Sequence, residues 1–400
     1  MKTRRMLFLV RRVGPYHDAR FAAAGGRLDL TVAETRPGSN EYPWTTAVAP
    51  RHYHLTSFRP APVPEVGWRG AGLEHAVSVV LDAHRPDVVA MSGWADPEYH
   101  ATLRQCAARG LPAVVMSDST RDDEPRRWWK ERLKRPLLRN YAAAVVAGTR
   151  SGEYIRELGF AAGAVFAPLD VVDNRYFAEA AGQARATAGT EPPRRFLCVA
   201  RFIAKKNLGG LLAAYAAYAA AAGPEAWGLT LAGSGELEAQ LRQQVAESGL
   251  GARVEFTGFA QYPELPALYA RAGALVLPSL SDQWGLVVNE AMAAGLPVLV
   301  SQACGCAPDL VRNGHNGWTF APHNARALAD CLRRVAALSP AEWAAMGRVS
   351  REIVAAYSPD AFARALAQAA ERALAAGHQP APQLARLVVH LLASRREAAT

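Results

Sequence analysis

Two cations follow an apolar segment in the second half of this 400-residue sequence. Arg201 comes directly after Phe196–Ala200, and Lys206 stands five residues further along the chain. Arginine offers a planar fork of N–H donors and lysine a compact point charge, so the two together can neutralise a diphosphate. The simpler alternative is ordinary surface charge on a loop. Their position after an apolar segment favours a phosphate site at the end of a strand.

Two carboxylates stand eight residues apart in the segment PSLSDQWGLVVNEAMAAGLPVLVS, which spans Pro278–Ser301. A strand is predicted to end at Pro278 and a helix to begin at Gly285–Leu286, where the free N–H groups of the first turn favour an anion. Glu290 lies about one turn into this helix, so its carboxylate can accept hydrogen bonds from ribose hydroxyls beside a diphosphate. Asp282 lies in the preceding loop and can reach hydroxyls of a sugar. The alternative is a helix with one solvated Glu and an Asp in the loop before it.

A glycine-containing turn adds a third junction of the same kind. The segment LAGSGELEAQL, Leu231–Leu241, places Gly233 and Gly235 between a predicted strand and a predicted helix. Glycine lets the backbone approach a ligand closely, but these two residues can equally serve only a tight turn.

These junctions must be positioned by strands and helices, and the sequence alternates between the two. Short apolar segments that end in turn signals are followed by longer helical patterns, which is typical of βαβ units on a parallel sheet. The predicted strands are Met6–Val10, Val88–Met91, Ala113–Met116, Val145–Ala147, Arg195–Ala200, Gly228–Ala232, Val254–Thr257, Ala274–Pro278 and Pro297–Ser301. The predicted helices are Gly72–Ala83, Glu98–Arg109, Asn207–Ala222, Glu236–Glu247 and Leu286–Ala294.

Two α/β domains of similar size follow from this alternation. The first is predicted over residues 1–175 and the second over 194–358, with the unpatterned segment Ala178–Pro193 as a linker. The helical, alanine-rich residues 360–400 are predicted to pack back on the first domain. Residues 38–70, rich in proline and aromatic side chains, are predicted to form a long irregular excursion. Because open parallel sheets bind ligands at the carboxyl ends of their strands, the site is expected in a cleft between the two sheets.

The composition is that of an ordinary globular protein, with half of the residues hydrophobic and a fifth charged. The formal net charge of +9 suits binding of nucleic acid, anionic lipid or a phosphorylated small molecule, although an arginine-rich surface explains it equally well. The five cysteines show no zinc-ligand spacing and are predicted to be reduced thiols of a cytosolic protein. The start MKTRRMLFLVRRVG has too few apolar residues for a signal peptide, and no stretch suits a transmembrane helix. The predicted location is therefore cytoplasmic.

Several of these motifs stand in the same order in glycosyltransferase family 4, which the chain resembles from Phe196 to about Pro322. The shared pattern is a strand followed by R-x4-K, a glycine turn, Gly-Phe at 258–259, and PS-x2-[acid]-x2-G-L-V-x2-EA-x3-G-x-PV. In the first half the resemblance continues through GPYHDARF at Gly14–Phe21, SDST at Ser117–Thr120 and LDVVDNRYF at Leu169–Phe177. It implies an α/β fold of the GT-B type, with two Rossmann-like domains facing across a cleft. The donor would bind the C-terminal domain and the acceptor the N-terminal one.

Carried over residue by residue, the resemblance implies a retaining transfer of a hexose-type sugar from a UDP-type or GDP-type donor. Arg201 and Lys206 would hold the donor phosphates, Glu290 the ribose and Asp282 the sugar. Phe259 would lie near the base. The implied donor-binding positions, taken together, are Gly14, Gly233, Gly235, Phe259, Trp284, Gly285, Leu286, Val287 and Glu290.

The chain departs from the family pattern at two places. Asp282 stands where the family usually has Glu, and its loop has Asp-Gln-Trp-Gly in place of Glu-Gly-Phe-Gly, which leaves the donor sugar open. Many relatives also carry a His after the strand equivalent to Ala113–Met116, where this chain has Ser-Asp-Ser. Asp118 and His17 are the candidates for that space near the reacting sugar, although a histidine of an ordinary turn is the simpler interpretation of His17.

No Asp-x-Asp motif between apolar residues is found, so neither a metal nor another cofactor is predicted, and the nucleotide sugar enters as a co-substrate. Arg201, Lys206 and a helix N-terminus would stabilise the departing nucleotide by preorganised charge. A non-catalytic nucleotide-sugar-binding protein of the same fold is the alternative. A dehydrogenase would need G-x-G-x-x-G after the first strand, where RRVGPYHDAR stands instead. Nucleic acid is not predicted as a partner, because outside one segment basic residues are not interleaved with aromatic ones.

That segment is RRWWKERLKRPLLR, Arg126–Arg139, which combines seven cations with two adjacent tryptophans. Such a composition suits docking on an anionic membrane or holding a phosphorylated lipid carrier. The alternative is a helix that buries Trp129 and Leu133 against the first domain and leaves its cations in water. The segment Gln383–Ser394 offers a second surface of the same kind. The predicted acceptor is a sugar, a glycolipid or a small molecule, reached by peripheral contact with the inner membrane face.

Overall fold

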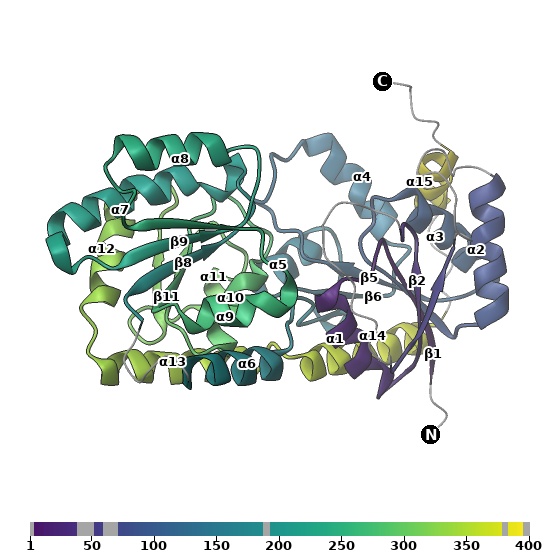
Figure 1. Cartoon of the computed structure of the whole chain (residues 1–400). Coiled ribbons are helices and arrows are strands. Elements are labelled where there is room, and N and C mark those ends of the chain that lie inside the picture. Colours follow the sequence, from purple (N-terminus) through teal and green to yellow (C-terminus); the bar gives the residue numbers. More distant parts are fainter. Residues whose placement is uncertain (1–3, 38–51, 59–70, 187–192, 378–382, 395–400) are drawn as a thin grey trace. The chain divides into compact units, whose positions relative to one another are not determined.

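The computed structural model describes residues 4–37, 52–58, 71–186, 193–377 and 383–394. The chain divides into two compact units. Unit 1 comprises Met1–Arg121, Pro125–Val171 and Pro359–Thr400, and unit 2 comprises Asp122–Glu124 and Val172–Ser358. The C-terminal helices therefore belong to the same unit as the first strand, as the sequence colours of Figure 1 show.

Among its described residues, unit 1 is built on a seven-stranded parallel sheet in the order β3-β2-β1-β4-β5-β6-β7. The strands are β1 (Arg5–Val10), β2 (Asp29–Glu34), β3 (His54–Ser57), β4 (Val88–Met91), β5 (Ala113–Ser117), β6 (Ala143–Val146) and β7 (Val165–Phe166). The central strands are almost continuously apolar because helices cover both faces of the sheet.

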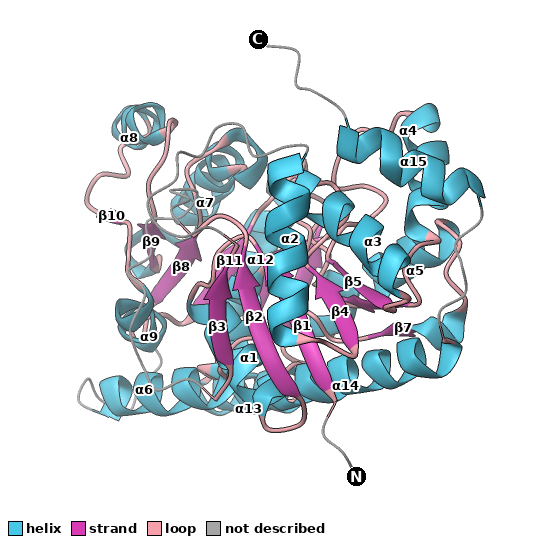
Figure 2. Cartoon of the chain, turned by 90° about the vertical axis from the view of Figure 1, so that its right-hand side faces the viewer, coloured by secondary structure: helices cyan, strands magenta, loops and turns pink. Residues whose placement is uncertain are grey.

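The helices of unit 1 surround this sheet. They are α1 (Pro15–Gly25), α2 (Ala71–His84), α3 (Pro97–Arg109), α4 (Trp128–Leu138), α5 (Thr149–Glu157), α14 (Pro359–Ala376) and α15 (Gln383–Ser394), with a 3-10 turn at Ala162–Ala164. Helix α14 packs on α1, and α15 packs on α3 and α4. Figure 2 shows α2 and α3 over one face of the sheet.

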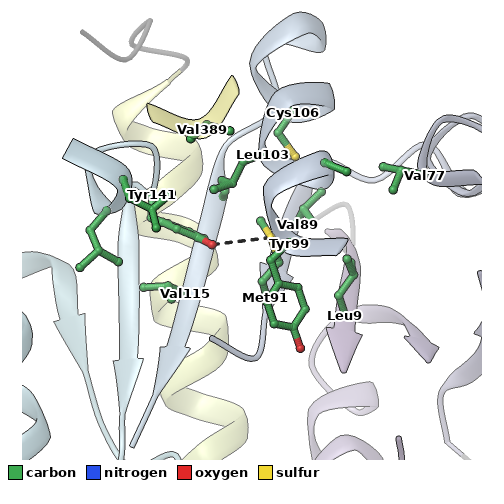
Figure 3. Packing of buried hydrophobic residues seen from close by; sticks show 14 of the residues in the cluster. Leu9, Val77, Val89, Met91, Tyr99, Leu103, Cys106, Val115, Tyr141 and Val389 are labelled. Atoms are coloured by element: carbon green, nitrogen blue, oxygen red, sulfur yellow. Dashed lines mark hydrogen bonds between the residues drawn. The ribbon is translucent and has the colours of Figure 1, made fainter. Parts of the chain in front are cut away.

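One core cluster fills the space between this sheet and helices α2, α3 and α15. Figure 3 labels part of it, with side chains from the strands (Leu9, Val89, Met91, Val115), from α2 and α3 (Val77, Tyr99, Leu103, Cys106) and from elsewhere (Tyr141, Val389). Because one of these side chains comes from α15, the C-terminal helix is part of the core of unit 1.

Unit 2, over its described residues, has a six-stranded parallel sheet in the order β10-β9-β8-β11-β12-β13. The strands are β8 (Arg195–Val199), β9 (Gly228–Ala232), β10 (Val254–Gly258), β11 (Ala274–Leu277), β12 (Val298–Ser301) and β13 (Gly317–Phe320). The α-helices are α6 (Asn174–Ala186), α7 (Leu208–Ala222), α8 (Glu238–Glu247), α9 (Leu265–Ala270), α10 (Leu286–Ala293), α11 (Ala307–Leu310), α12 (Ala325–Ala336) and α13 (Pro340–Val354). The 3-10 turns η2 (Ala204–Lys206), η3 (Gly223–Glu225) and η4 (Tyr262–Glu264) complete the unit.

Each sheet has a point where the chain changes direction across it. In unit 2 the chain runs from β8 through β9 to β10 on one side, and then returns to β11 on the other side of β8. In unit 1 the same change occurs between β1 and β4. Open α/β sheets bind ligands outside the carboxyl ends of the strands at such a switch point. A ligand site of unit 2 is therefore expected at the loops after β8 and β11.

The predicted α/β class with two parallel sheets is confirmed, and every predicted strand and helix occurs with ends shifted by at most two residues. One prediction is wrong, and a second is wrong only for the few residues of it that the structure describes. Most of the expected linker Ala178–Pro193 continues helix α6, because alanine favours a helix even without an amphipathic pattern. Within the expected excursion 38–70, His54–Ser57 forms the short edge strand β3, while 38–51 and 59–70 lie outside the described residues.

Candidate functional site

The loop after β8 places two cations at the switch point of unit 2. Arg201 is exposed, and Lys206 ends the 3-10 turn η2. Asn207 follows with a left-handed backbone (φ 53°), and its side-chain amide donates to the carbonyls of Pro278 at 3.2 Å and Pro322 at 2.9 Å. This asparagine therefore ties the turn that carries Lys206 to the loops after β11 and β13. The sequence analysis did not identify it, although it directly follows the two lysines.

Lys206 and Asp282 form an ion pair, with Nζ 2.5 Å from Oδ2 and only 14% of each side chain exposed. The hydroxyl of the buried Ser279 lies 3.3 Å from the same carboxylate oxygen. The backbone N–H of Leu280 also donates to the carbonyl of Lys205 at 2.8 Å. The structure thus joins the two motifs that the sequence analysis singled out separately, although Lys206 and Asp282 are 76 positions apart in the sequence.

The loop that carries Asp282 is held by the turn after β12. The Asp282 carbonyl accepts from the N–H of Gly305 at 2.9 Å, and the Trp284 carbonyl accepts from the N–H of Cys306 at 3.2 Å. A Cβ atom on Gly305 would lie 1.7 Å from the carbonyl oxygen of Gln283, so only glycine allows this approach. The position of Asp282 is therefore fixed from two sides, by Lys206 and by this turn.

Trp284, one of the expected donor-binding residues, lies in the same loop. It is buried, its Nε1 donates to Oδ1 of Asn289 at 2.9 Å, and its ring lies 5.4 Å from that of Tyr357. The larger aromatic of this loop therefore packs inward. Its expected contact with the donor stays a prediction.

Gly285 precedes the first residue of helix α10 and lies in the loop after β11. Its φ of 109° is a left-handed backbone conformation that favours glycine. Leu286 and Val287 are partly exposed in that turn. Glu290 is buried further along, where its Oε2 accepts from the hydroxyl of Tyr269 at 2.6 Å. A ribose hydroxyl can reach this carboxylate only if a side chain around it moves. The expected ribose contact of Glu290 thus stays a prediction, and the sequence analysis missed Tyr269.

The glycine turn after β9 packs against the backbone beside Arg201. A Cβ atom on Gly233 (φ 143°) would lie 1.9 Å from the carbonyl oxygen of Ala200, and one on Gly235 would lie 2.6 Å from that of Phe202. The N–H of Phe202 donates to the carbonyl of Ser234 at 2.8 Å. Close packing between neighbouring strand ends therefore accounts for both glycines.

Phe259 follows β10 in the same sheet and is more than a third exposed. With it, the carboxyl ends of β8, β9, β10 and β11 carry all the donor-binding residues implied for the second half of the chain.

The remaining candidates lie in unit 1, where Gly14 and His17 follow β1 and Asp118 follows β5. Nδ1 of His17 accepts from the N–H of Gly14 at 3.2 Å, which assigns the ring proton to Nε2. Burial, with a smaller effect of the Arg20 charge, lowers the pKa of His17 well below its ordinary value. His17 is therefore neutral at physiological pH and offers an N–H donor.

Arg20 is a buried cation that the sequence analysis missed. Its Nη1 donates to the carbonyl of Leu169 at 3.2 Å, and its guanidinium lies 5.3 Å from the ring of Phe362. Burial lowers the pKa of Arg20, while the charges of Asp170 and Asp118 oppose that shift. Asp118 thus faces a buried positive charge. In the sequence Arg20 is one of 45 basic residues, and no local pattern marks it as buried.

In the part of the chain that the structure describes, no group of three or more His, Cys, Asp or Glu side chains is arranged to hold a metal ion. A pocket of about 560 Å³ lies in unit 1 beside α3 and α15 and is lined by Arg104, Asn140 and Leu387 among others. Of the helices formed by described residues, none is both long and apolar enough to cross a membrane.

Comparison of the sequence with known families and proteins finds similarity to glycosyltransferases. Residues 183–351 match the family described as glycosyl transferases group 1. The amylovoran biosynthesis glycosyltransferase AmsK of Erwinia amylovora is 35% identical over 170 residues, which cover 40% of this chain and 41% of that protein. The glycogen synthase of Mycobacterium tuberculosis is 34% identical over 168 residues, 42% of this chain and 40% of that protein. The chain thus spans about two fifths of the length of these curated relatives.

Comparison of the fold extends over nearly the whole chain. Sucrose-phosphate synthase from Thermosynechococcus elongatus superposes with a TM-score of 0.71 at 21% identity, covering 94% of this chain and 100% of that structure. The complex of Anabaena HepE with UDP-glucose superposes with a TM-score of 0.66 at 19% identity, covering 92% and 98%. These similarities show the GT-B fold, with two Rossmann-like units, that the sequence resemblance implies.

Proposed function

Because residues 183–351 match the family described as glycosyl transferases group 1, we propose that the chain is a glycosyltransferase that uses a nucleotide-diphosphate sugar. The observation that supports this most directly is the ion pair of Lys206 and Asp282 at the switch point of unit 2. It joins a cation suited to a phosphate with a carboxylate suited to sugar hydroxyls, in the loops after β8 and β11.

The donor is proposed to be a UDP or GDP derivative of a hexose. The Anabaena HepE structures of similar fold hold UDP and UDP-glucose, which favours uridine within this proposal. The nucleotide would lie at the strand ends that carry Gly233, Phe259 and Glu290. Its diphosphate would lie between Arg201, Lys206 and the N–H groups of the first turn of α10.

The proposed reaction breaks the bond between the anomeric carbon and the diphosphate oxygen and forms one from that carbon to an acceptor oxygen. The leaving diphosphate gains negative charge as the bond breaks, and Arg201, Lys206 and the α10 N-terminus would stabilise that charge without a metal ion. The acceptor hydroxyl gives up its proton. Asp118 and His17 of unit 1 are the proposed residues near the reacting sugar, and retention of the anomeric configuration is part of the proposal.

The acceptor, a sugar, a glycolipid or a small molecule, is proposed to bind unit 1. Peripheral contact with an anionic membrane through Arg126–Arg139 is a separate proposal that does not depend on the transfer reaction. The alternative function is non-catalytic binding of a nucleotide sugar, which Asp282 favours because it is one methylene shorter than the usual Glu.

A panel of UDP and GDP sugars tested by thermal shift identifies the donor, since a ligand at 100 times its Kd adds about 2.7 kcal/mol of stability. Release of free nucleotide from that donor is then measured with candidate acceptors, with and without a chelator. Acceptor-dependent release that survives the chelator supports a metal-independent transferase. Binding without release under any acceptor favours the non-catalytic alternative, and no stabilisation by any nucleotide sugar contradicts both.

A further inference from the structure

Two helices of unit 1 carry most of the large apolar side chains that the described residues expose. Trp128, Trp129 and Leu133 lie on α4, and Leu387 and Leu391 lie on α15. The two helices pack against each other and adjoin in Figure 2. In addition, the side chain of Asn140, just after α4, lies 3.4 Å from the carbonyl of Ala385 in α15. We call the exposed residues of these two helices the α4–α15 face.

The exposure of these side chains decides between the two interpretations of Arg126–Arg139. A helix that simply covers unit 1 would bury Trp129 and Leu133, yet these are 44% and 47% exposed and Trp128 is 75% exposed. Helix α4 is anchored instead by the buried Leu137 and Leu138 near its C-terminus. The interpretation that buries Trp129 and Leu133 is therefore wrong.

The single carboxylate of α4 is engaged within the unit. Glu131 accepts from the ammonium of Lys134 at 2.7 Å and from the hydroxyl of Tyr154 at 2.6 Å. The guanidinium of Arg126 lies 4.8 Å from the ring of the same tyrosine. Lys134 and Arg126 thus hold the helix in place, and they are not the cations to remove in a test of docking.

The outer side of α4 is positively charged, and α15 contributes no acid between Gln383 and Ser394. The exposed cations on and beside α4 are Arg127, Lys130, Arg132, Arg135 and Arg139. Another protein that covered this face would have to supply a carboxylate for nearly every cation. An anionic lipid surface supplies that charge everywhere, and tryptophan suits the boundary between water and acyl chains.

We propose that the α4–α15 face docks the protein reversibly on an anionic lipid bilayer. The tryptophans and leucines would enter the head-group boundary while the arginine and lysine side chains contact lipid phosphates. This inference uses no residue of the candidate site in unit 2. It can therefore hold or fail independently of the proposed sugar transfer.

The test is cosedimentation of the full chain with phosphatidylcholine vesicles that contain increasing fractions of phosphatidylglycerol. Binding should rise with phosphatidylglycerol and fall as added salt screens the charges. In the charge variant, Arg127, Lys130, Arg132 and Arg135 are each replaced by Gln. Its partition coefficient should fall roughly five-fold per cation, hence several hundred-fold in total.

A matched control removes the same charge elsewhere, from the exposed residues Arg326, Arg348, Arg364 and Arg372. It should keep most of the binding, and thermal unfolding of both variants checks that they fold. Trp128→Ala should weaken binding at every salt concentration, because its contribution is apolar.

Three results would overturn the proposal: no vesicle binding at low salt, equal loss in the two charge variants, or a dimer in solution that Trp128→Ala dissociates. Binding of an RNA oligonucleotide in place of vesicles would assign the face to nucleic acid. Nucleotide release with a water-soluble acceptor should be the same in the charge variant and the wild type. If the charge variant lost that release, its replaced cations would serve the transfer reaction itself, and its weaker vesicle binding would not count for the docking proposal.

Discussion

Nζ of Lys206 lies 2.5 Å from Oδ2 of Asp282. A donor phosphate would therefore have to compete with this carboxylate for the ammonium group. The neighbouring Lys205 is exposed and contributes its backbone carbonyl, rather than its side chain, to the loop after β11. We therefore predict that Lys206→Ala lowers kcat by about two to three orders of magnitude, as removal of an oxyanion-stabilising donor does. Lys205→Ala, the matched control, should leave kcat nearly unchanged. Similar losses in both variants would show that the effect is general charge and not a defined contact.

The two carboxylates should separate nucleotide binding from turnover. Glu290→Gln is predicted to weaken the affinity for free UDP, because the amide offers the ribose one acceptor where the carboxylate offers two. Asp282→Asn is predicted to impair turnover, because it removes the carboxylate proposed to bind the sugar. It should not weaken the affinity for UDP, because the change also releases Lys206 from its ion pair. Calorimetric titration of both variants with UDP measures this, and equal losses of affinity would contradict the division. Tyr269→Phe removes the hydrogen bond to Glu290 and serves as the control for a merely displaced carboxylate.

His17 gives a prediction for stability against pH. Its folded pKa lies below the ordinary value of 6.5, so below that pH the unfolded chain binds more protons at this site than the folded chain does. The folded state is then progressively disfavoured as the pH falls below 6.5, and the loss ends only below the folded pKa. Urea unfolding between neutral and mildly acidic pH should show a smaller loss for His17→Gln than for the wild type. Parallel curves would mean that His17 titrates normally.

At the residue scale, the sequence was a better guide to the two charged residues of the site than to the burial of side chains. Lys206 and Asp282 each follow an apolar strand, so their types and positions were enough to single them out. The inward packing of Trp284 and the burial of Arg20 depend on Tyr357 and Phe362, which lie far away along the chain. A local pattern carries no information about such partners.

At the scale of elements, strands were predictable because parallel strands buried on both faces are continuous apolar segments. Helix α6 was not, because its buried face beyond Phe177 is formed by alanine, whose small side chain gives little apolar periodicity. Its Phe177 is buried, with its ring 5.9 Å from that of Tyr269, the partner of Glu290. The helix that continues into the expected linker therefore supports the candidate site, through a residue just before that linker.

The contribution of α6 can be measured. Phe177→Ala is predicted to lower the free energy of unfolding by about 3–5 kcal/mol, the usual cost of removing a buried phenyl ring. Arg175→Ala changes the same helix at an exposed residue and should have little effect. Chemical denaturation followed by circular dichroism gives both values. If Phe177→Ala behaved like Arg175→Ala, α6 would not be part of the folded core of unit 2.

At the scale of the molecule, the order of motifs along the chain predicted two α/β domains, and the fold comparison bears this out. The sequence does not show which strands are neighbours in each sheet. Motifs after β8 and β11 meet because the chain leaves β10 and crosses back over β8, and this crossover is a property of the whole sheet. The long-range pairing of Lys206 with Asp282 is thus a result of topology and not of either motif.

Because the chain returns to unit 1 at Pro359, removal of the residues from Pro359 onward should destabilise unit 1 and leave unit 2 folded. Helix α14 packs on α1 and buries Phe362 against Phe21, with the ring centroids 6.5 Å apart, so unit 1 cannot complete its core without the last residues.

We predict that a chain ending at Ser358 has a disordered unit 1 and a folded unit 2. Limited proteolysis with mass spectrometry should find unit 1 cleaved and residues 193–358 protected. If unit 2 also carries the nucleotide site, UDP should still raise the melting temperature of the shortened chain, while acceptor-dependent release should be lost. Protection of unit 1 in that chain would mean that α14 and α15 are accessories and not parts of its core.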